Sequence, residues 1–205
     1  NSFANSSTAL ILANNDLTIS ASTISNQGTK PSESIITSGI ASINGNVTLK
    51  TDILNNDSGI ITSKTTNLSS LNAASVSFSN SLGVFVSTAA IILDLGNLNY
   101  TITGIVTASN IDITASNITN QGNVTATDYI KLNASGVSGV GGNIINGFAS
   151  GDNSDVQLVA GSYIDFTAKN NILNYGVISA TTDLTLTTSN GNVNNYSVGK
   201  IRGGS

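Results

Sequence analysis

The 205-residue chain contains no cysteine, histidine, methionine or tryptophan, and Pro31 is its only proline. Without cysteine or histidine, a disulfide framework and metal sites built on those ligands are excluded. Without histidine, a Ser-His-Asp catalytic arrangement is excluded as well. We therefore predict no cofactor and no metal. The lack of cysteine fits a bacterial surface or secreted protein.

Charge is also scarce, because charged residues make up 9% of the chain and the net charge is −4. The seven basic residues are scattered, which disfavours an electrostatic grip on nucleic acid. The most apolar stretch, 84–95, is too short to span a bilayer and includes Asp94. No signal peptide is visible, since Asn1 opens a polar stretch without a basic region. Surface polarity must therefore come from Ser, Thr and Asn, which suit turns and strand faces.

One pattern recurs along the chain. Residues 111–132 hold an apolar-x-apolar strand, an Asn-Gln-Gly turn and the same strand again, with Ile111 and Ile130 19 positions apart. Residues 164–186 repeat the pattern with a step of 20, and residues 16–28 resemble its first part. A period near 20 residues with short strands predicts a solenoid, in which each repeat buries its apolar face against the next.

Strict alternation orients these strands: Ile111 and Ile113 flank Asp112, as Ile130 and Leu132 flank Lys131. Because side chains alternate between the two faces of a strand, the apolar residues of each strand all point inward. The sequence thus predicts an all-β fold, a parallel β-helix with coils of about 20 residues, formed by residues 1–205 as a single segment. We expect the Asn residues that precede Gly to form a hydrogen-bonded ladder. Three aspartates precede strands and are expected to accept backbone N–H bonds: Asp16, Asp128 and Asp183.

Three stretches are less regular. Residues 29–42 contain Pro31 and predict a loop at one corner. Residues 81–104 hold apolar runs typical of strands buried on both faces, and a helix at 87–95 is the alternative. Residues 135–155 are rich in glycine. The pattern runs on to the last residues, so we expect a segment of a longer solenoid.

The repeats at 118–136 (ITNQGNVTATDYIKLNASG), 170–196 (NNILNYGVISATTDLTLTTSNGNVNNY) and 54–63 (LNNDSGIITS) resemble those of filamentous haemagglutinin-type exoproteins. The resemblance covers about two thirds of the chain and is weakest at 71–109. It implies a right-handed β-helix, exported through an outer-membrane two-partner transporter and exposed at the bacterial cell surface. Members are adhesins, haemolysins or stalks of contact-dependent growth-inhibition proteins. The Asn-Pro-Asn-Leu-like motif of the family's secretion domain is absent, which places this chain in the repeat shaft.

Few residues suggest chemistry. Asp152, Asp155 and Asp165 are the candidates for paired-carboxylate catalysis on a polysaccharide, yet Asp152 and Asp155 sit in a Gly/Asn/Ser stretch typical of solvated turns. Residues 151–155 offer oxygen ligands for Ca²⁺, but their spacing falls short of a known calcium loop. Residues 139–142 lack the Lys-Ser/Thr of a phosphate loop. We predict no catalytic, cofactor-binding or metal residue.

Five tyrosines and several Asn-x-Ser/Thr sequons complete the candidates. The tyrosines could form a carbohydrate stripe or pack at corners, and packing is favoured: Tyr100, Tyr129, Tyr163, Tyr175 and Tyr196. Sequons at Asn67 and Asn117 are expected by chance in so Asn-rich a chain. The sequence therefore predicts a non-enzymatic structural and adhesive shaft that contacts a host or neighbouring-cell receptor or glycan. A self-assembling filament subunit is the alternative, and a carbohydrate-active enzyme is the least favoured function.

Overall fold

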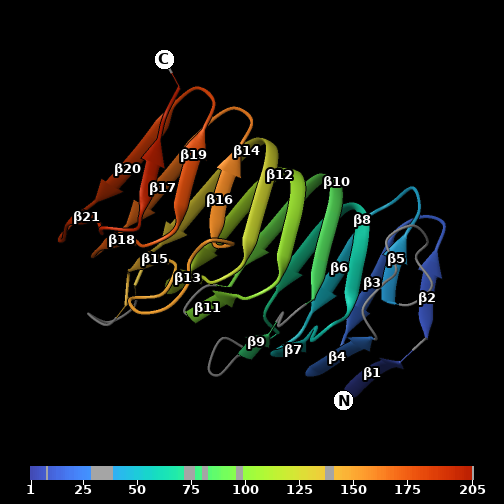
Figure 1. Ribbon diagram of the computed structural model, residues 1–205. Coiled ribbons are helices and arrows are strands. Elements are labelled where there is room, and N and C mark those ends of the chain that lie inside the picture. Colours follow the sequence, from blue (N-terminus) through green and yellow to red (C-terminus); the bar gives the residue numbers. More distant parts are fainter. Residues whose placement is uncertain are drawn as a thin grey trace.

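The structure is a computed structural model that describes residues 1–7, 9–28, 39–71, 77–79, 83–95, 99–136 and 141–204. These residues form 22 strands and no helix, and every strand pair among them is parallel. The fold is therefore all-β with parallel sheets, as the alternating pattern predicts. Figure 1 shows the strands stacked side by side in chain order from the blue end to the red end.

The chain visits three strand positions in rotation, and we call one such circuit a round. Face 1 carries the longest uninterrupted ladder, in which each strand pairs with the strand of the next round. Its strands are β2 (Leu10–Ala13), β5 (Gly39–Ser42), β8 (Ile60–Ser69), β10 (Val84–Asp94), β12 (Ile105–Ala115), β14 (Asn123–Ala134), β16 (Gln157–Ala160), β19 (Val177–Ala180) and β22 (Lys200–Arg202).

Face 2 follows face 1 in each round. The four long strands β8, β10, β12 and β14 bend from face 1 into face 2 and thereby join both faces into one 13-stranded sheet. The bend is visible in the register between β10 and β8, which shifts between Ser87 and Ala90. The other face 2 strands are β3 (Leu17–Ser20), β6 (Val47–Lys50), β17 (Ile164–Ala168) and β20 (Leu184–Thr188).

Face 3 follows face 2 in each round and consists of two sheets. The first sheet contains β1 (Ser2–Ser7), β4 (Thr23–Gly28), β7 (Ile53–Asn55) and β9 (Ser77–Ser79). The second contains β11 (Asn99–Ile102), β13 (Asn117–Asn120), β15 (Ile144–Asn146), β18 (Ile172–Asn174) and β21 (Val193–Asn195).

Pairing on face 2 measures the length of a round. Ile91, Ile111, Ile130, Ile164 and Leu184 pair in succession, at spacings of 20, 19, 34 and 20 residues. The spacing near 20 that the sequence predicts is therefore the basic one. The 34-residue round is longer because it contains the glycine-rich stretch 135–155.

Alternation places one apolar row of each strand inside. β14 alternates buried Val124 and Ala126 on face 1, then Ile130 and Leu132 on face 2, with outward Thr125 and Lys131 between them. Burying an Ile or Leu side chain stabilises the fold by about 1.5–3 kcal/mol. The inward side chains merge into one core: Ile24, Ile40, Val47, Leu49, Leu54, Ile61, Leu68, Phe85, Ile91, Leu93, Tyr100, Val106, Ile111, Ile113, Ile118, Val124, Ile130, Leu132, Ile144, Leu158, Ile164, Phe166, Ile172 and Ile178.

Asparagines at the end of face 3 form two ladders, buried everywhere except at the terminal Asn195, which confirms the predicted stacking of Asn before Gly. In the longer ladder, Asn120 Nδ2 donates to Asn146 Oδ1 at 2.8 Å, Asn146 to Asn174 at 2.8 Å and Asn174 to Asn195 at 2.7 Å. Each amide nitrogen also donates to a backbone carbonyl, as Asn146 does to Val177 O at 3.0 Å. The shorter ladder joins three residues of the first rounds: Asn5, Asn26 and Asn56.

A second asparagine row runs along the start of face 3 in the later rounds. Asn117 Nδ2 donates to Asn99 Oδ1 at 2.6 Å, and Asn117 Oδ1 accepts the Asn143 backbone N–H at 2.9 Å. Asn143 Oδ1 in turn accepts the Asn171 backbone N–H at 3.1 Å. This outer row is more exposed than the buried ladder. The spacing Asn-x-x-Asn in 117–120, 143–146 and 171–174 therefore encodes one inner and one outer ladder.

The structure describes parts of all three less regular stretches. Of residues 29–42, 29–38 lie outside the described residues and 39–42 form strand β5. Residues 84–94 form strand β10, so the helix alternative at 87–95 is wrong. Of residues 135–155, 137–140 lie outside the described residues, Ile144–Asn146 is strand β15, and 147–155 form a loop.

Candidate functional site

A row of glycines precedes the face 1 strands. Gly104 and Gly122 stand directly before β12 and β14. A Cβ atom on Gly122 would lie 2.2 Å from the Gly104 carbonyl oxygen, so the close approach of successive rounds requires glycine there. Because glycine has no side chain, the same requirement leaves the surface hollow along this row.

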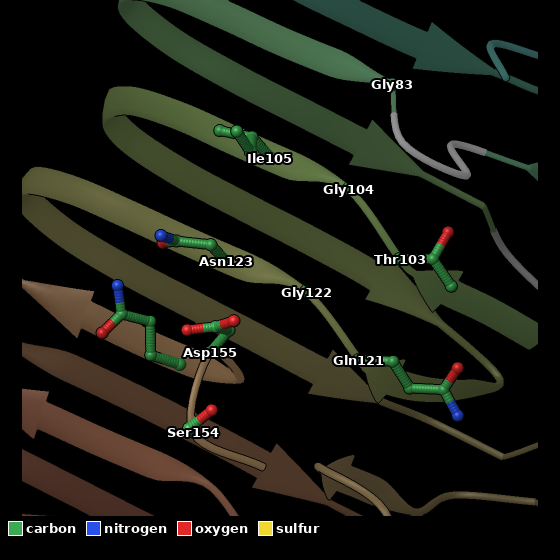
Figure 2. Close-up of a pocket in the computed structure, with 10 residues that line it drawn as sticks. Gly83, Thr103, Gly104, Ile105, Gln121, Gly122, Asn123, Ser154 and Asp155 are labelled. Carbon is green, nitrogen blue, oxygen red and sulfur yellow. The ribbon is translucent and has the colours of Figure 1, made fainter. Parts of the chain in front are cut away.

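The hollow is a groove of about 560 Å³ (Figure 2). Its floor is the glycine row, and its rim consists of polar side chains from three successive rounds. Ile105, Asn123 and Gln157 stand in register at the start of their face 1 strands. The ten residues that line the groove are Gly83, Thr103, Gly104, Ile105, Gln121, Gly122, Asn123, Ser154, Asp155 and Gln157.

The loop 147–155 supplies the carboxylate of the groove, Asp155. Asn153 holds this loop, since its Oδ1 accepts the Phe148 N–H at 2.6 Å and its Nδ2 donates to Phe148 O at 3.1 Å. Asp152 Oδ1 accepts the Ser154 N–H at 2.9 Å, and this bond lowers the pKa of the Asp152 carboxyl. The Asp152 carboxylate therefore shapes the loop, while the exposed Asp155 lines the groove.

The three carboxylates considered for catalysis do not line one groove. Asp165 lies on β17, on the outside of face 2, where it lines a smaller hollow of about 300 Å³ with Asp112 and Lys131. Asp155 is the one carboxylate among the residues that line the larger groove. Two-carboxylate hydrolysis of a glycoside needs a pair flanking the same bond. The larger groove offers binding contacts instead.

Charged and aromatic side chains on the outside of face 2 contact one another. The Tyr129 and Tyr163 rings stack with centroids 5.1 Å apart, and Lys131 Nζ lies 4.8 Å from the Tyr129 centroid. Tyr129 Oη donates to Asp112 Oδ2 at 3.0 Å. Partial burial, followed by this bond, raises the pKa of Tyr129, and the neighbouring Tyr163 hydroxyl raises the pKa of Lys131.

The other tyrosines also pack. Tyr175 and Tyr196 stack at 4.2 Å with their planes 4° apart, and Tyr100 is buried inside face 3. Stacking between successive rounds accounts for both of these partly exposed pairs. The structure therefore favours the packing interpretation of the tyrosines over a sugar-binding stripe.

The remaining predicted residues have local structural contacts. Asp16 Oδ1 accepts the Asn46 N–H at 2.8 Å, which confirms its corner role. Asp128 Oδ2 faces the side-chain amide of Asn110 at 3.1 Å. Among the described residues, no backbone N–H donates to the side chain of Asp128 or Asp183, so the predicted backbone bonds are wrong for these two aspartates. Asn117 belongs to the outer ladder, and Asn67 lies on β8. Of the suggested phosphate loop 139–142, residues 139 and 140 lie outside the described residues.

Sequence reasoning missed most of the groove, including Thr103, Gln121, Asn123 and Gln157. The available signal was glycine placed just before the face 1 strands in several rounds, at 59, 83, 104, 122, 176 and 199. Within the described residues, no three His, Cys, Asp or Glu side chains are grouped to hold a metal ion. The described part of the chain likewise contains no helix with the length and apolarity to cross a membrane. No protein-family model, curated protein or solved structure matches this chain.

Proposed function

We propose that this chain is a segment of the shaft of a secreted bacterial surface exoprotein, and that its rounds form a right-handed parallel β-helix. Its role is to extend and to display surfaces for contact with a host or neighbouring cell. Export through an outer-membrane two-partner transporter is part of the proposal. The resemblance of residues 118–136 and 170–196 to filamentous haemagglutinin-type repeats supports this assignment.

The observation that carries the scaffold role is the ladder Asn120–Asn146–Asn174–Asn195, whose first three residues are buried. Each buried amide is satisfied by the rounds next to it, and the surrounding apolar core is continuous. Fully satisfied buried networks specify one arrangement and resist distortion. Each added round therefore lengthens and stiffens the structure without creating a new catalytic constellation.

Small-angle X-ray scattering tests the scaffold role directly. Nine strands stack along face 1, and eight spacings of about 4.8 Å give an expected axial length of roughly 40 Å for a monomer. A particle of this length at every protein concentration supports a stiff segment. Particles that lengthen with concentration would favour the self-assembling filament, and an expanded scattering profile would contradict both functions.

The surface location is tested on producing cells with an antibody raised to this segment. Immunogold labelling of intact cells and a band in the medium far larger than 20.8 kDa are the expected results. Labelling confined to permeabilised cells would contradict the proposed export. Release of sugars from a polysaccharide panel, lost in Asp165→Asn, would instead support the enzymatic alternative.

A further inference from the structure

We propose that the groove along Gly104 and Gly122 is a binding site for an uncharged, hydroxyl-rich oligosaccharide, with Asp155 and Gln157 as hydrogen-bonding anchors. This ligand class would add to the proposed role in cell contact, but the groove residues alone support it. A shaft that binds no sugar would leave the scaffold function intact. Figure 2 shows the polar side chains placed around the glycine floor.

The chemistry of the lining selects the ligand. None of the described residues that line the groove is Lys or Arg, so they offer an anionic ligand no countercharge. Among the described lining residues, Ile105 is the one large apolar side chain, which is too little for an apolar ligand. One carboxylate alone does not form a site for a metal cation. Amides, hydroxyls and a carboxylate together both donate and accept, as sugar hydroxyls do.

The lining side chains are available for a ligand. Among the described residues, the side chains of Gln121, Asp155 and Gln157 make no hydrogen bond within the protein, whereas Asn123 Oδ1 accepts from Thr125 Oγ1 at 3.0 Å. The backbone floor is satisfied, because Asn123 N donates to Gly104 O and Gln157 N donates to Gly122 O. A ligand would therefore bond to the polar side chains, because the backbone N–H groups of the floor already have partners.

The groove is also preorganised and of suitable size. The Asn153 side chain bonds to both the backbone N–H and the backbone carbonyl of Phe148. These two bonds fix the segment that leads to Asp155. Gln121 directly follows β13 and Gln157 is the first residue of β16, and strand pairing sets the register of both strands. A volume of about 560 Å³ falls within the range of small-molecule sites. A short oligosaccharide lying along the glycine row would span two or three rounds.

The test is saturation-transfer NMR of the whole chain with cellotriose, maltotriose and tri-N-acetylchitotriose. Sialyllactose and the chitosan trimer serve as the anionic and cationic comparators. We expect at least one neutral trisaccharide to bind with a dissociation constant of about 1 mM or tighter. Asp155→Asn should weaken that affinity about tenfold, because hydrogen bonds to a charged acceptor are the strong ones. Gln157→Ala should weaken it about threefold to tenfold.

Asp165→Asn is the matched control, since it removes the same charge from the outside of face 2. It should leave the affinity unchanged, and all three variants should melt at the temperature of the parent chain. Absence of binding by all neutral sugars at about 10 mM would overturn the proposal. Binding of the charged comparators alone would overturn it too, as would a neutral sugar whose affinity neither Asp155→Asn nor Gln157→Ala lowers.

Discussion

The same buried corner between face 1 and face 2 is filled differently in the two halves of the molecule. In the later rounds it holds alanine, in the order Ala108, Ala126, Ala160 and Ala180. In the earlier rounds the paired residues Ser63 and Ser87 occupy it. Thr66, which lies on face 2 and pairs with Val47 of the preceding round, contacts both serines.

The hydroxyl group of each residue in this trio is satisfied by the other two. Thr66 Oγ1 lies 2.9 Å from Ser63 Oγ and 2.9 Å from Ser87 Oγ, and the two serine oxygens are 3.3 Å apart. Buried hydroxyls are tolerated when they are hydrogen-bonded. The comparison shows that one backbone geometry accepts either an apolar corner or a closed polar cluster.

The two halves meet in a round that belongs to neither pattern. On β11, Ile102 pairs with Asn120 and so occupies the position of the buried asparagine. The later ladder therefore ends at Asn120, whose Oδ1 accepts the N–H of Gly122 at 3.1 Å. Tyr100 pairs with Ile118, and its buried hydroxyl finds no partner among the described residues. Among the described residues, the Tyr100 hydroxyl is the one buried side-chain polar atom without a hydrogen bond.

The largest expected effect comes from breaking the later ladder at its middle. Asn146→Ala removes the donor to Asn174 and to Val177 and the acceptor of Asn120, and it leaves buried polar groups unpaired. We expect a loss of about 3 kcal/mol in the free energy of unfolding, measured by urea denaturation. The exposed Asn133→Ala is the control and should cost less than about 0.5 kcal/mol. Equal losses in the two variants would contradict a stabilising ladder.

The hydroxyl trio gives the next largest effect. Thr66→Val keeps the side-chain shape but deprives Ser63 and Ser87 of their shared partner, so we expect a loss of about 1–2 kcal/mol. The triple variant Ser63→Ala, Thr66→Val and Ser87→Ala has the apolar pattern of the later rounds. Its free energy of unfolding should be close to that of the parent chain, because none of the three hydroxyls remains to be left unpaired. A triple variant less stable than Thr66→Val would show that the two corner types are not interchangeable.

Tyr100→Phe tests the junction round and should raise the free energy of unfolding by about 1 kcal/mol, since it removes a buried hydroxyl that has no partner among the described residues. Burial raises the pKa of Tyr100. The folded state therefore holds this proton more tightly than the unfolded state does. The resulting contribution to stability is complete below the unfolded value near pH 10 and is lost as the pH rises above it.

The parent chain should thus lose stability above about pH 10, and Tyr100→Phe should lose less. Urea denaturation at pH 8 and at higher pH checks both statements. The exposed Tyr196→Phe is the matched control. An identical alkaline loss in the parent chain and in Tyr100→Phe would show that Tyr100 does not cause it.

The smallest effect is expected in the outer asparagine row. Asn143→Ala removes the acceptor of the Asn171 N–H, but water reaches this half-exposed row and replaces the bond. We expect a loss of about 0.5 kcal/mol, clearly below that of Asn146→Ala. Hydrogen exchange of the Asn171 amide gives a local readout and should accelerate. A loss equal to that of Asn146→Ala would remove the distinction between the inner and outer ladders.

Much of the strand pattern could be predicted because alternation is a local property. Ile111-Asp112-Ile113 and its repeats show which side chains face inward, and Asn before Gly showed where a ladder would run. The groove could not be predicted in this way. Gln121 and Gln157 are 36 residues apart in the sequence and come together only because their rounds are stacked. Asp155 reaches the groove through a loop whose conformation depends on Asn153.

The sequence by itself determined that the chain forms strands with one apolar row, because a period of two assigns each side chain to one face. It did not determine whether 87–95 is strand or helix, since an unbroken apolar run satisfies both periods. The tertiary structure decided that point by pairing β10 with β8 and β12 on either side. It also decided that Asp155 and Asp165 line different hollows, because that depends on how the chain turns its corners and not on any local pattern.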